Sequence, residues 1–272
     1  MLITLLYGLL IVLASVVLAV AGLRLLQRSV SLPKRERNNT ATGGIYAALY
    51  VMFGVSVGFS LFLTWQQYYT ARQVAKNEAV AVEQVYRLAD RLPEPNRSRV
   101  QDQAISYTRS VVEEEWPSMR QGEESPRAKA RLGELRRSVQ DFQPQTDAQS
   151  DLYSESLAEL DEVEANRELR LLAVNEGIPY MVWIVLVIGG VLTVAFTYLF
   201  GIEPAWLHAV AVAGLALMVS LVLHVIGVLD YPFNSGVQVQ PEAFEEVLSE
   251  IGSKVEPIYR AELLRPPFHG PG

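Results

Sequence analysis

The chain of 272 residues contains no cysteine, so disulfide bonds, thiolate metal sites and cysteine nucleophiles are excluded. It also lacks the GxxxxGK[ST], GxGxxG, HExxH and GxSxG motifs of common nucleotide-binding and hydrolytic sites. The three histidines, His208, His224 and His269, are too scattered to predict a metal site. We therefore expect no enzyme activity and no cofactor. The formal net charge of −7 argues against nucleic acid as a partner.

Charged side chains are missing from four long stretches, and each stretch holds the roughly 20 apolar residues that a helix needs to cross a bilayer. The expected spans are Leu2–Leu26, Gly43–Trp65, Ile178–Phe200 and Ala205–Leu229. No Lys or Arg precedes the first apolar run, so we do not expect it to be a cleaved signal peptide. The sequence predicts an all-α integral membrane protein in a lipid bilayer.

Four spans divide the chain into four expected regions. Residues 1–65 hold helices 1 and 2 with a basic connection, 66–177 form an extramembrane helical bundle, 178–229 hold helices 3 and 4, and 230–272 form a turn, a short helix and a tail. An even number of spans places both termini and the large loop on one face of the membrane.

Orientation depends on the Lys and Arg residues near the ends of the spans. The first connection carries Arg24, Arg28, Lys34, Arg35 and Arg37, and the opposite side carries Arg72, Lys76, Arg167 and Arg170. This small excess favours a cytoplasmic first connection and an extracytoplasmic large loop.

The large loop has helical periodicity throughout. Small and apolar residues at alternating spacings of three and four continue the second span as a stalk, until Pro93 and Pro95 stop it: Ala71, Ala75, Glu78, Val82, Val85, Ala89 and Leu92. Three more amphipathic helices are expected, one before Trp116, one after the Ser125-Pro126 cap and one from about Asp147 to the third span. Such helices predict an antiparallel bundle.

Small and hydroxyl side chains recur along the spans. Gly54 and Gly58 form a GxxxG pair, and Gly189, Thr193 and Thr197 follow one another every four residues, so both sets are candidates for close helix packing. Ser56, Ser60 and Thr64 form a similar row on the second span. These hydroxyls either pack against a neighbouring helix or line a water-filled path for anions.

Two ionisable residues stand out. Glu78 lies on the otherwise apolar stalk seam, where it either pairs with an arginine or marks the edge of the packed stripe. His224 lies near the end of the fourth span, where an interfacial imidazole costs little, although an ionisable residue in a span is also a functional candidate. The run Glu113, Glu114 and Glu115 is expected to be a solvated face.

The sequence after the fourth span predicts a turn and then a short helix. We expect Asp230 to end the span in water, Pro232 to prevent its continuation, and Asn234-Ser235-Gly236 to turn the chain. Pro241 and Glu242 then suit a helix start. Acidic residues occupy its polar face, which favours docking of its apolar stripe on the stalk over insertion into the membrane surface.

Three stretches resemble the bestrophin-like family of bacterial four-span membrane proteins: Thr64–Pro95, Arg167–Gly201 and LDYPFNSGVQVQPEAF from Leu229. The resemblance to true bestrophins, which are oligomeric anion channels, depends on Pro232-Phe233 and Gly236. Animal bestrophins follow this point with acidic residues that hold calcium. This chain has Val237-Gln238-Val239-Gln240, so no calcium site is expected.

Two functions follow from the resemblance and from the bundle. The first is a homo-oligomeric, passive channel for small anions in the bacterial plasma (inner) membrane, with the hydroxyl row of the second span along its path. The second is a non-conducting membrane sensor or scaffold that binds a ligand or a protein through its helical bundle.

Overall fold

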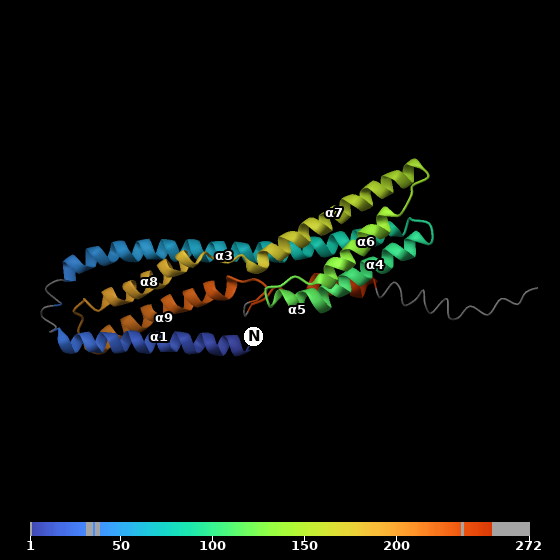
Figure 1. Cartoon of the computed structure of the whole chain (residues 1–272). Coiled ribbons are helices and arrows are strands. Elements are labelled where there is room, and N and C mark those ends of the chain that lie inside the picture. Colours follow the sequence, from blue (N-terminus) through green and yellow to red (C-terminus); the bar gives the residue numbers. More distant parts are fainter. Residues whose placement is uncertain (1, 31–34, 36–38, 235–236, 252–272) are drawn as a thin grey trace, which may run out of the picture. The chain divides into compact units, whose positions relative to one another are not determined.

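The computed structural model describes residues 2–30, 35, 39–234 and 237–251 (Figure 1). Within these ranges the chain is helical and contains no strand. The elements in order are α1 (Leu2–Ser29), α3 (Asn39–Ala89), α4 (Asn96–Ser110), the π-helical segment η1 (Val111–Glu115), α5 (Trp116–Met119), α6 (Pro126–Gln140), α7 (Asp147–Asn175), α8 (Tyr180–Thr197) and α9 (Ala205–Leu229).

Four helices are long and apolar enough to cross a membrane: Leu6–Ser29, Thr42–Ala89, Tyr180–Thr197 and Ala205–Leu229. They coincide with the four predicted spans. Residue contacts divide the chain into two units. The first, called here the membrane unit, comprises Met1–Tyr69 and Glu176–Gln238, and the second, called here the bundle unit, comprises Thr70–Asn175 and Val239–Gly272.

The membrane unit has two small apolar cores. In the first, Ala19 and Leu23 of α1 pack with Val194 of α8 and with Val212 and Ala216 of α9. The second joins α8, α9 and α3 through Ile178, Leu186 and Ile226, against which Val57 and Leu61 of α3 pack. Small residues at these contacts let the helices approach closely, as is typical of helices packed in a membrane.

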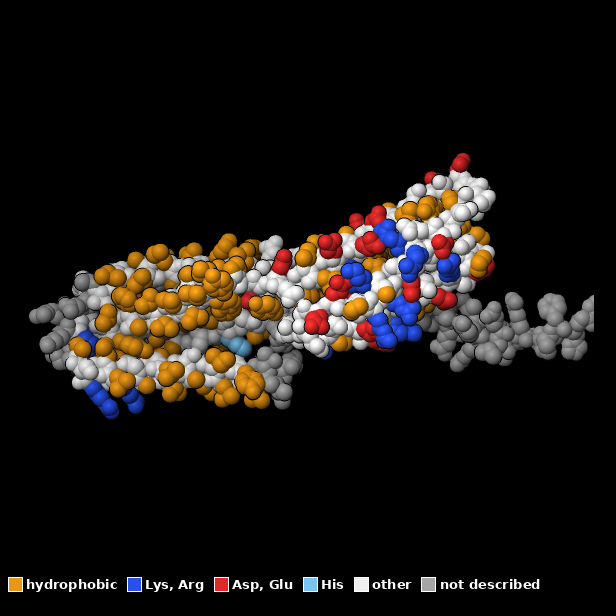
Figure 2. All heavy atoms as spheres, in the orientation of Figure 1, with side chains coloured by type: hydrophobic (Ala, Val, Ile, Leu, Met, Phe, Trp, Pro, Cys, Tyr) orange, Lys and Arg blue, Asp and Glu red, His pale blue; other side chains and the backbone are white. Residues whose placement is uncertain are grey.

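Large apolar side chains also cover much of the outer surface of the membrane unit (Figure 2). Leu18 of α1, Met52 of α3, Val191 of α8 and Met218 of α9 are all more than half exposed. An apolar surface of this extent requires lipid or another protein chain as its surroundings.

The predicted stalk seam is confirmed within the bundle unit. All seven seam residues are buried: Ala71, Ala75, Glu78, Val82, Val85, Ala89 and Leu92. The seam packs in a unit whose other helices are α4, α6 and α7. The predicted cap of α6 is also confirmed, because the Ser125 hydroxyl accepts a hydrogen bond from the backbone N–H of Ala128 at 3.3 Å.

The short helix after the fourth span is present at residues 242–251. Its apolar stripe is buried, with Phe244, Val247 and Ile251 at most 5% exposed. The Phe244 ring meets the Trp116 ring edge to face at 5.7 Å, and Glu250 pairs with Arg87 of α3 at 3.0 Å. The helix therefore docks on the bundle unit, as its acidic polar face predicted.

Candidate functional site

The hydroxyl row of α3 does not lie on one kind of surface. Ser56 is exposed and donates a hydrogen bond to the Met52 carbonyl, whereas Ser60 and Thr64 are 5% and 0% exposed. The Thr64 hydroxyl donates to the carbonyls of Ser60 and Leu61. Side chains that are buried within a single chain stay buried when chains assemble. The expectation of three hydroxyls along one path therefore narrows to Ser56.

Gly54 and Gly58 lie on the exposed side of α3. A Cβ atom at either position would have nothing within 4 Å. These two glycines therefore serve no contact inside the described chain, and they leave a shallow, uncharged strip on the surface of the helix.

The small residues of α8 have the opposite surroundings. A Cβ atom at Gly189 would lie 2.8 Å from the Phe53 ring of α3, and one at Gly190 would lie 2.9 Å from Val219 of α9. Thr193 is 2% exposed, and Thr197 donates its hydroxyl hydrogen bond to the Val194 carbonyl. This face of α8 lies inside the membrane unit, where it lets α3 and α9 approach.

His224 is half-buried against α1. A Cβ atom at Gly8 would lie only 2.2 Å from its Nε2, so the imidazole occupies the space that this glycine leaves. With Ser15, Ser220 and Tyr198 it lines a largely apolar cavity of about 710 Å³ between α1, α8 and α9. No group of three His, Asp or Glu side chains that could hold a metal ion occurs in the part of the chain that was described.

The most polar buried site lies in the bundle unit and is called here the ion cluster: Glu78, Glu115, Arg167 and Arg170. The Arg170 guanidinium is fully buried and binds Glu78 twice, at 2.6 and 2.9 Å, and Glu115 once, at 2.7 Å. Arg167 binds the other side of Glu115 and also reaches Glu124 at 3.0 Å. Two carboxylates and two guanidinium groups leave the ion cluster with no net formal charge.

Aromatic residues complete the ion cluster. The Arg170 guanidinium lies 5.1 Å from the Trp116 ring centroid and 5.7 Å from that of Phe244, within the range of cation–π attraction. The Tyr107 hydroxyl donates a 2.6 Å hydrogen bond to Glu78. Burial, followed by the neighbouring Glu78 carboxylate, holds the pKa of Tyr107 well above its usual value. Tyr107 therefore stays protonated and acts as a donor to the cluster.

A π-helical turn brings Glu115 and Trp116 to the cluster together. The Trp116 N–H bonds to the Val111 carbonyl five residues earlier, rather than four. Pro117 has no N–H and its ring crowds the carbonyl of the preceding turn, which is a known cause of such distortions. Both Glu115 and Trp116 are buried as a result. The expectation that Glu113, Glu114 and Glu115 form a solvated face is therefore wrong for Glu115.

Asp230 is 2% exposed, so the expectation that it ends the fourth span in water is wrong. Its carboxylate accepts hydrogen bonds from the backbone N–H of Ile178 at 2.6 Å and from Trp183 Nε1 at 2.9 Å. The end of α9 thereby supplies acceptors at the start of α8, where Pro179 has no side chain able to cap the helix. α9 ends at Leu229 as predicted, and Pro232 and Phe233 are buried behind it. Residues 235–236 of the expected turn lie outside the described residues.

Sequence reasoning missed Arg167 and Arg170 as site residues and counted them only as charges near a span. A signal was present, because they continue the buried stripe of α7 at spacings of three and four: Leu160, Val163, Arg167, Arg170 and Val174. Arginine in such a stripe requires buried carboxylate partners. Glu78 on the stalk seam was one of them, and its pairing with an arginine was one of the two predicted alternatives.

Comparison with known proteins agrees with this architecture. The family model described as a bestrophin-like domain matches residues 13–244. The crystal structure of a bacterial bestrophin homologue from Klebsiella pneumoniae shares the fold with a TM-score of 0.65 at 11% identity, covering 90% of this chain and 98% of that one. A single-site variant of a bestrophin homologue from the same organism gives a TM-score of 0.69 at 11% identity, covering 93% and 99%. No curated protein matches the sequence.

Proposed function

The chain belongs to the bestrophin-like family, and on that premise we propose that it forms a homo-oligomeric channel for small anions in the bacterial inner membrane. Its four apolar helices and its family make it an integral membrane protein. Bestrophin homologues are oligomeric anion channels rather than enzymes. The anion path, the assembly of this chain and its membrane are part of the proposal.

The observation that carries the proposal is the exposed face of α3. No charged residue occurs between Asn38 and Ala71, and Ser56 and Gly58 lie on the exposed side of the helix. Helices from several subunits that meet along this face would enclose an uncharged path. Such a path suits a passive anion channel, in which hydroxyl and backbone groups replace part of the hydration of the ion.

Chloride flux into liposomes tests this proposal, and the cysteine-free chain makes a sharp version available. We expect flux through purified wild-type oligomers. In a Ser56→Cys variant, a negatively charged, thiol-specific reagent should block this flux. Thr64→Cys is the buried control on the same helix and should be insensitive, and Val225→Cys, exposed on α9, is the control for labelling away from the path.

A non-conducting sensor or scaffold is the competing function. The bundle unit favours it, because a buried, fully paired ion cluster fixes the relative positions of α3, η1 and α7 within that unit. Folded oligomers that show no chloride flux across varied voltage, pH and calcium concentration would replace the channel by this second function.

A further inference from the structure

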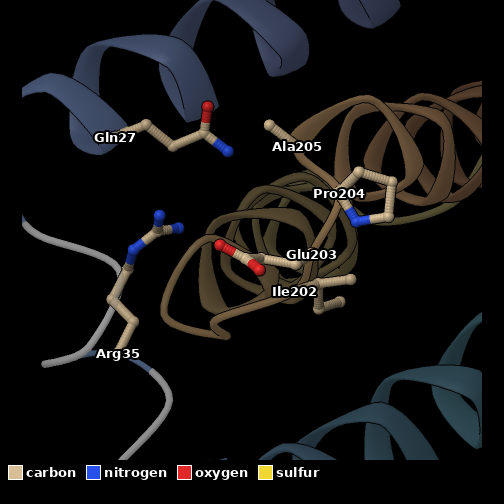
Figure 3. A pocket seen from close by; sticks show the side chains of 6 residues that line it. All are labelled: Gln27, Arg35, Ile202, Glu203, Pro204 and Ala205. Carbon is tan, nitrogen blue, oxygen red and sulfur yellow. The ribbon is translucent and has the colours of Figure 1, made fainter.

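A polar pocket of about 680 Å³ lies in the membrane unit, where α1 ends and α8 connects to α9 (Figure 3). Its walls are Gln27 of α1, Arg35, and the residues that lead into α9, from Ile202 to Ala205. Figure 3 shows the Arg35 guanidinium, the Gln27 amide and the Glu203 carboxylate pointing toward a common space. This pocket is separate from the α3 face and from the ion cluster.

Arg35 is 7% exposed, yet it has no carboxylate within ion-pair distance among the described residues. Its Nη1 donates to the Phe200 carbonyl at 3.2 Å, and its Nε is buried without an acceptor in the described chain. A neutral carbonyl compensates a buried guanidinium poorly, because a buried charge requires a charged partner. The position of Arg35 therefore calls for an anionic group in the pocket.

The connection that carries this pocket is tied down nearby. The Asn39 side chain both donates to the Gly201 carbonyl and accepts from the Gly201 N–H, at 2.9 Å in each case. These bonds hold the start of α3 against the residue that precedes Ile202. The distance between the Arg35 and Glu203 walls is therefore set by backbone contacts and not by direct pairing of the two side chains.

Glu203 gives the pocket a second, opposite charge. It is exposed, and no ion pair joins it to Arg35. The first backbone N–H groups of α9 follow directly and, together with the helix dipole, add positive potential beside Arg35. A ligand that carries a negative and a positive group close together satisfies both walls at once.

We propose that this pocket binds the zwitterionic headgroup of a phosphatidylethanolamine-type phospholipid, with its phosphate on Arg35 and Gln27 and its primary ammonium on Glu203. Guanidinium and phosphate form strong charge-assisted hydrogen bonds. A lipid is the source favoured over a soluble phosphoamine, because Leu25 and Trp206 beside the pocket are 63% and 66% exposed and offer apolar surface to acyl chains. Exposed tryptophan is typical of the headgroup level of a membrane.

Native mass spectrometry of the full chain, released from nanodiscs of mixed lipids, tests the proposal. We expect wild-type protein to retain phosphatidylethanolamine about tenfold over phosphatidylglycerol, which lacks the amine, and over phosphatidylcholine, whose ammonium cannot donate a hydrogen bond. Glu203→Gln should abolish the preference for the ethanolamine lipid and leave the glycerol lipid bound. Arg35→Gln should reduce retention of both.

Arg24→Gln removes an exposed arginine of α1 outside the pocket lining and should leave the preference unchanged. Equal retention of the three lipids by the wild type would overturn the proposal, and so would an unaltered preference in Glu203→Gln. The Glu203 variant changes an exposed residue, so its result stands even if Arg35→Gln fails to fold. Displacement of the lipid by millimolar phosphoethanolamine would instead identify a soluble ligand and overturn the assignment to lipid. The test needs no ion conduction, so it is independent of channel activity.

Discussion

Arg170 holds Glu78 by a fork of two hydrogen bonds, Nε to Oε2 at 2.6 Å and Nη2 to Oε1 at 2.9 Å, and both side chains are fully buried. Ninety-two positions separate the two residues in the sequence. The pair therefore joins the stalk part of α3 to α7 inside the bundle unit. A bidentate pair fixes distance and direction together, which a single contact between point charges does not.

Breaking the pair should destabilise the bundle unit severely. Arg170→Met leaves Glu78 buried without its charge partner, and we expect a loss of about 3–5 kcal/mol in the free energy of unfolding. Chemical denaturation followed by circular dichroism measures it. Arg136→Met is the matched control, because Arg136 pairs with the exposed Asp161, and it should cost less than about 1 kcal/mol. Equal losses in the two variants would contradict a special role for the buried pair.

Asp230 should be needed for the start of α8. Asp230→Ala leaves the Ile178 N–H and the Trp183 indole N–H without acceptors, at about 1–3 kcal/mol for each buried group. Thermal unfolding and tryptophan fluorescence should both change. Trp183→Phe removes only the side-chain donor and should cost less than Asp230→Ala. A larger effect of Trp183→Phe would place the role of Asp230 elsewhere.

Glu159 on α7 should make stability fall between acidic and neutral pH. Burial, followed by the carboxylates of Glu162 and Glu155, raises its pKa. A group with a raised folded-state pKa contributes stability that is complete below its unfolded pKa and is lost as the pH rises through the folded pKa. Glu159→Gln should therefore gain about 0.5 kcal/mol relative to wild type at pH 7 and nothing near pH 4. Melting curves at several pH values measure this difference, and a constant difference would contradict it.

Gly54 and Gly58 should matter for assembly and not for folding of the single chain. Leucine at both positions meets nothing within 4 Å of the added Cβ atoms, yet it fills the strip where another α3 would approach. We expect crosslinking to show loss of the oligomer. Gly44→Leu is the control, since Gly44 is equally open and lies nearer the start of the same helix. An intact oligomer in the double variant would remove these glycines from the interface.

Four spans require that Gln121 and Arg260 lie on the same side of the membrane and Glu36 on the other. Single cysteines at these positions in the cysteine-free chain should therefore react with an impermeant reagent in two classes. Gln121 is preferred to the adjacent Gly122, whose φ of +82° disfavours a side chain. Opposite reactivity of positions 121 and 260 would contradict an even number of spans. The class that reacts in intact cells also tests the prediction of an extracytoplasmic large loop.

Periodic features of the sequence predicted most of the helices. Uncharged runs located the spans, and alternating spacings of three and four located the seam that includes Ala75 and Val82, because burial of a helix face imposes its period on the sequence. The cap at Ser125 was predicted for the same local reason: its acceptor and donor are three residues apart.

The contacts that define the buried sites are long-range, and no local pattern encodes them. Asp230 looked like a solvated helix end because its partners, Ile178 and Trp183, precede it by half a membrane hairpin. Glu115 looked solvated because regular α-helical spacing gave no reason to turn it inward together with Trp116. In both cases burial depends on which helix lies opposite, and that is decided by the tertiary fold.

The π turn before Pro117 also bears on how sequences of this family are aligned. It is one residue longer than the α-helical turn it replaces, so a relative that lacks it aligns with a single-residue gap between Val111 and Trp116. Such a relative can present the carboxylate or the indole to its arginines, but not both in the present geometry. The length of this segment, together with the identity of the residue at position 78, therefore sorts homologous sequences into those that can build the ion cluster and those that cannot.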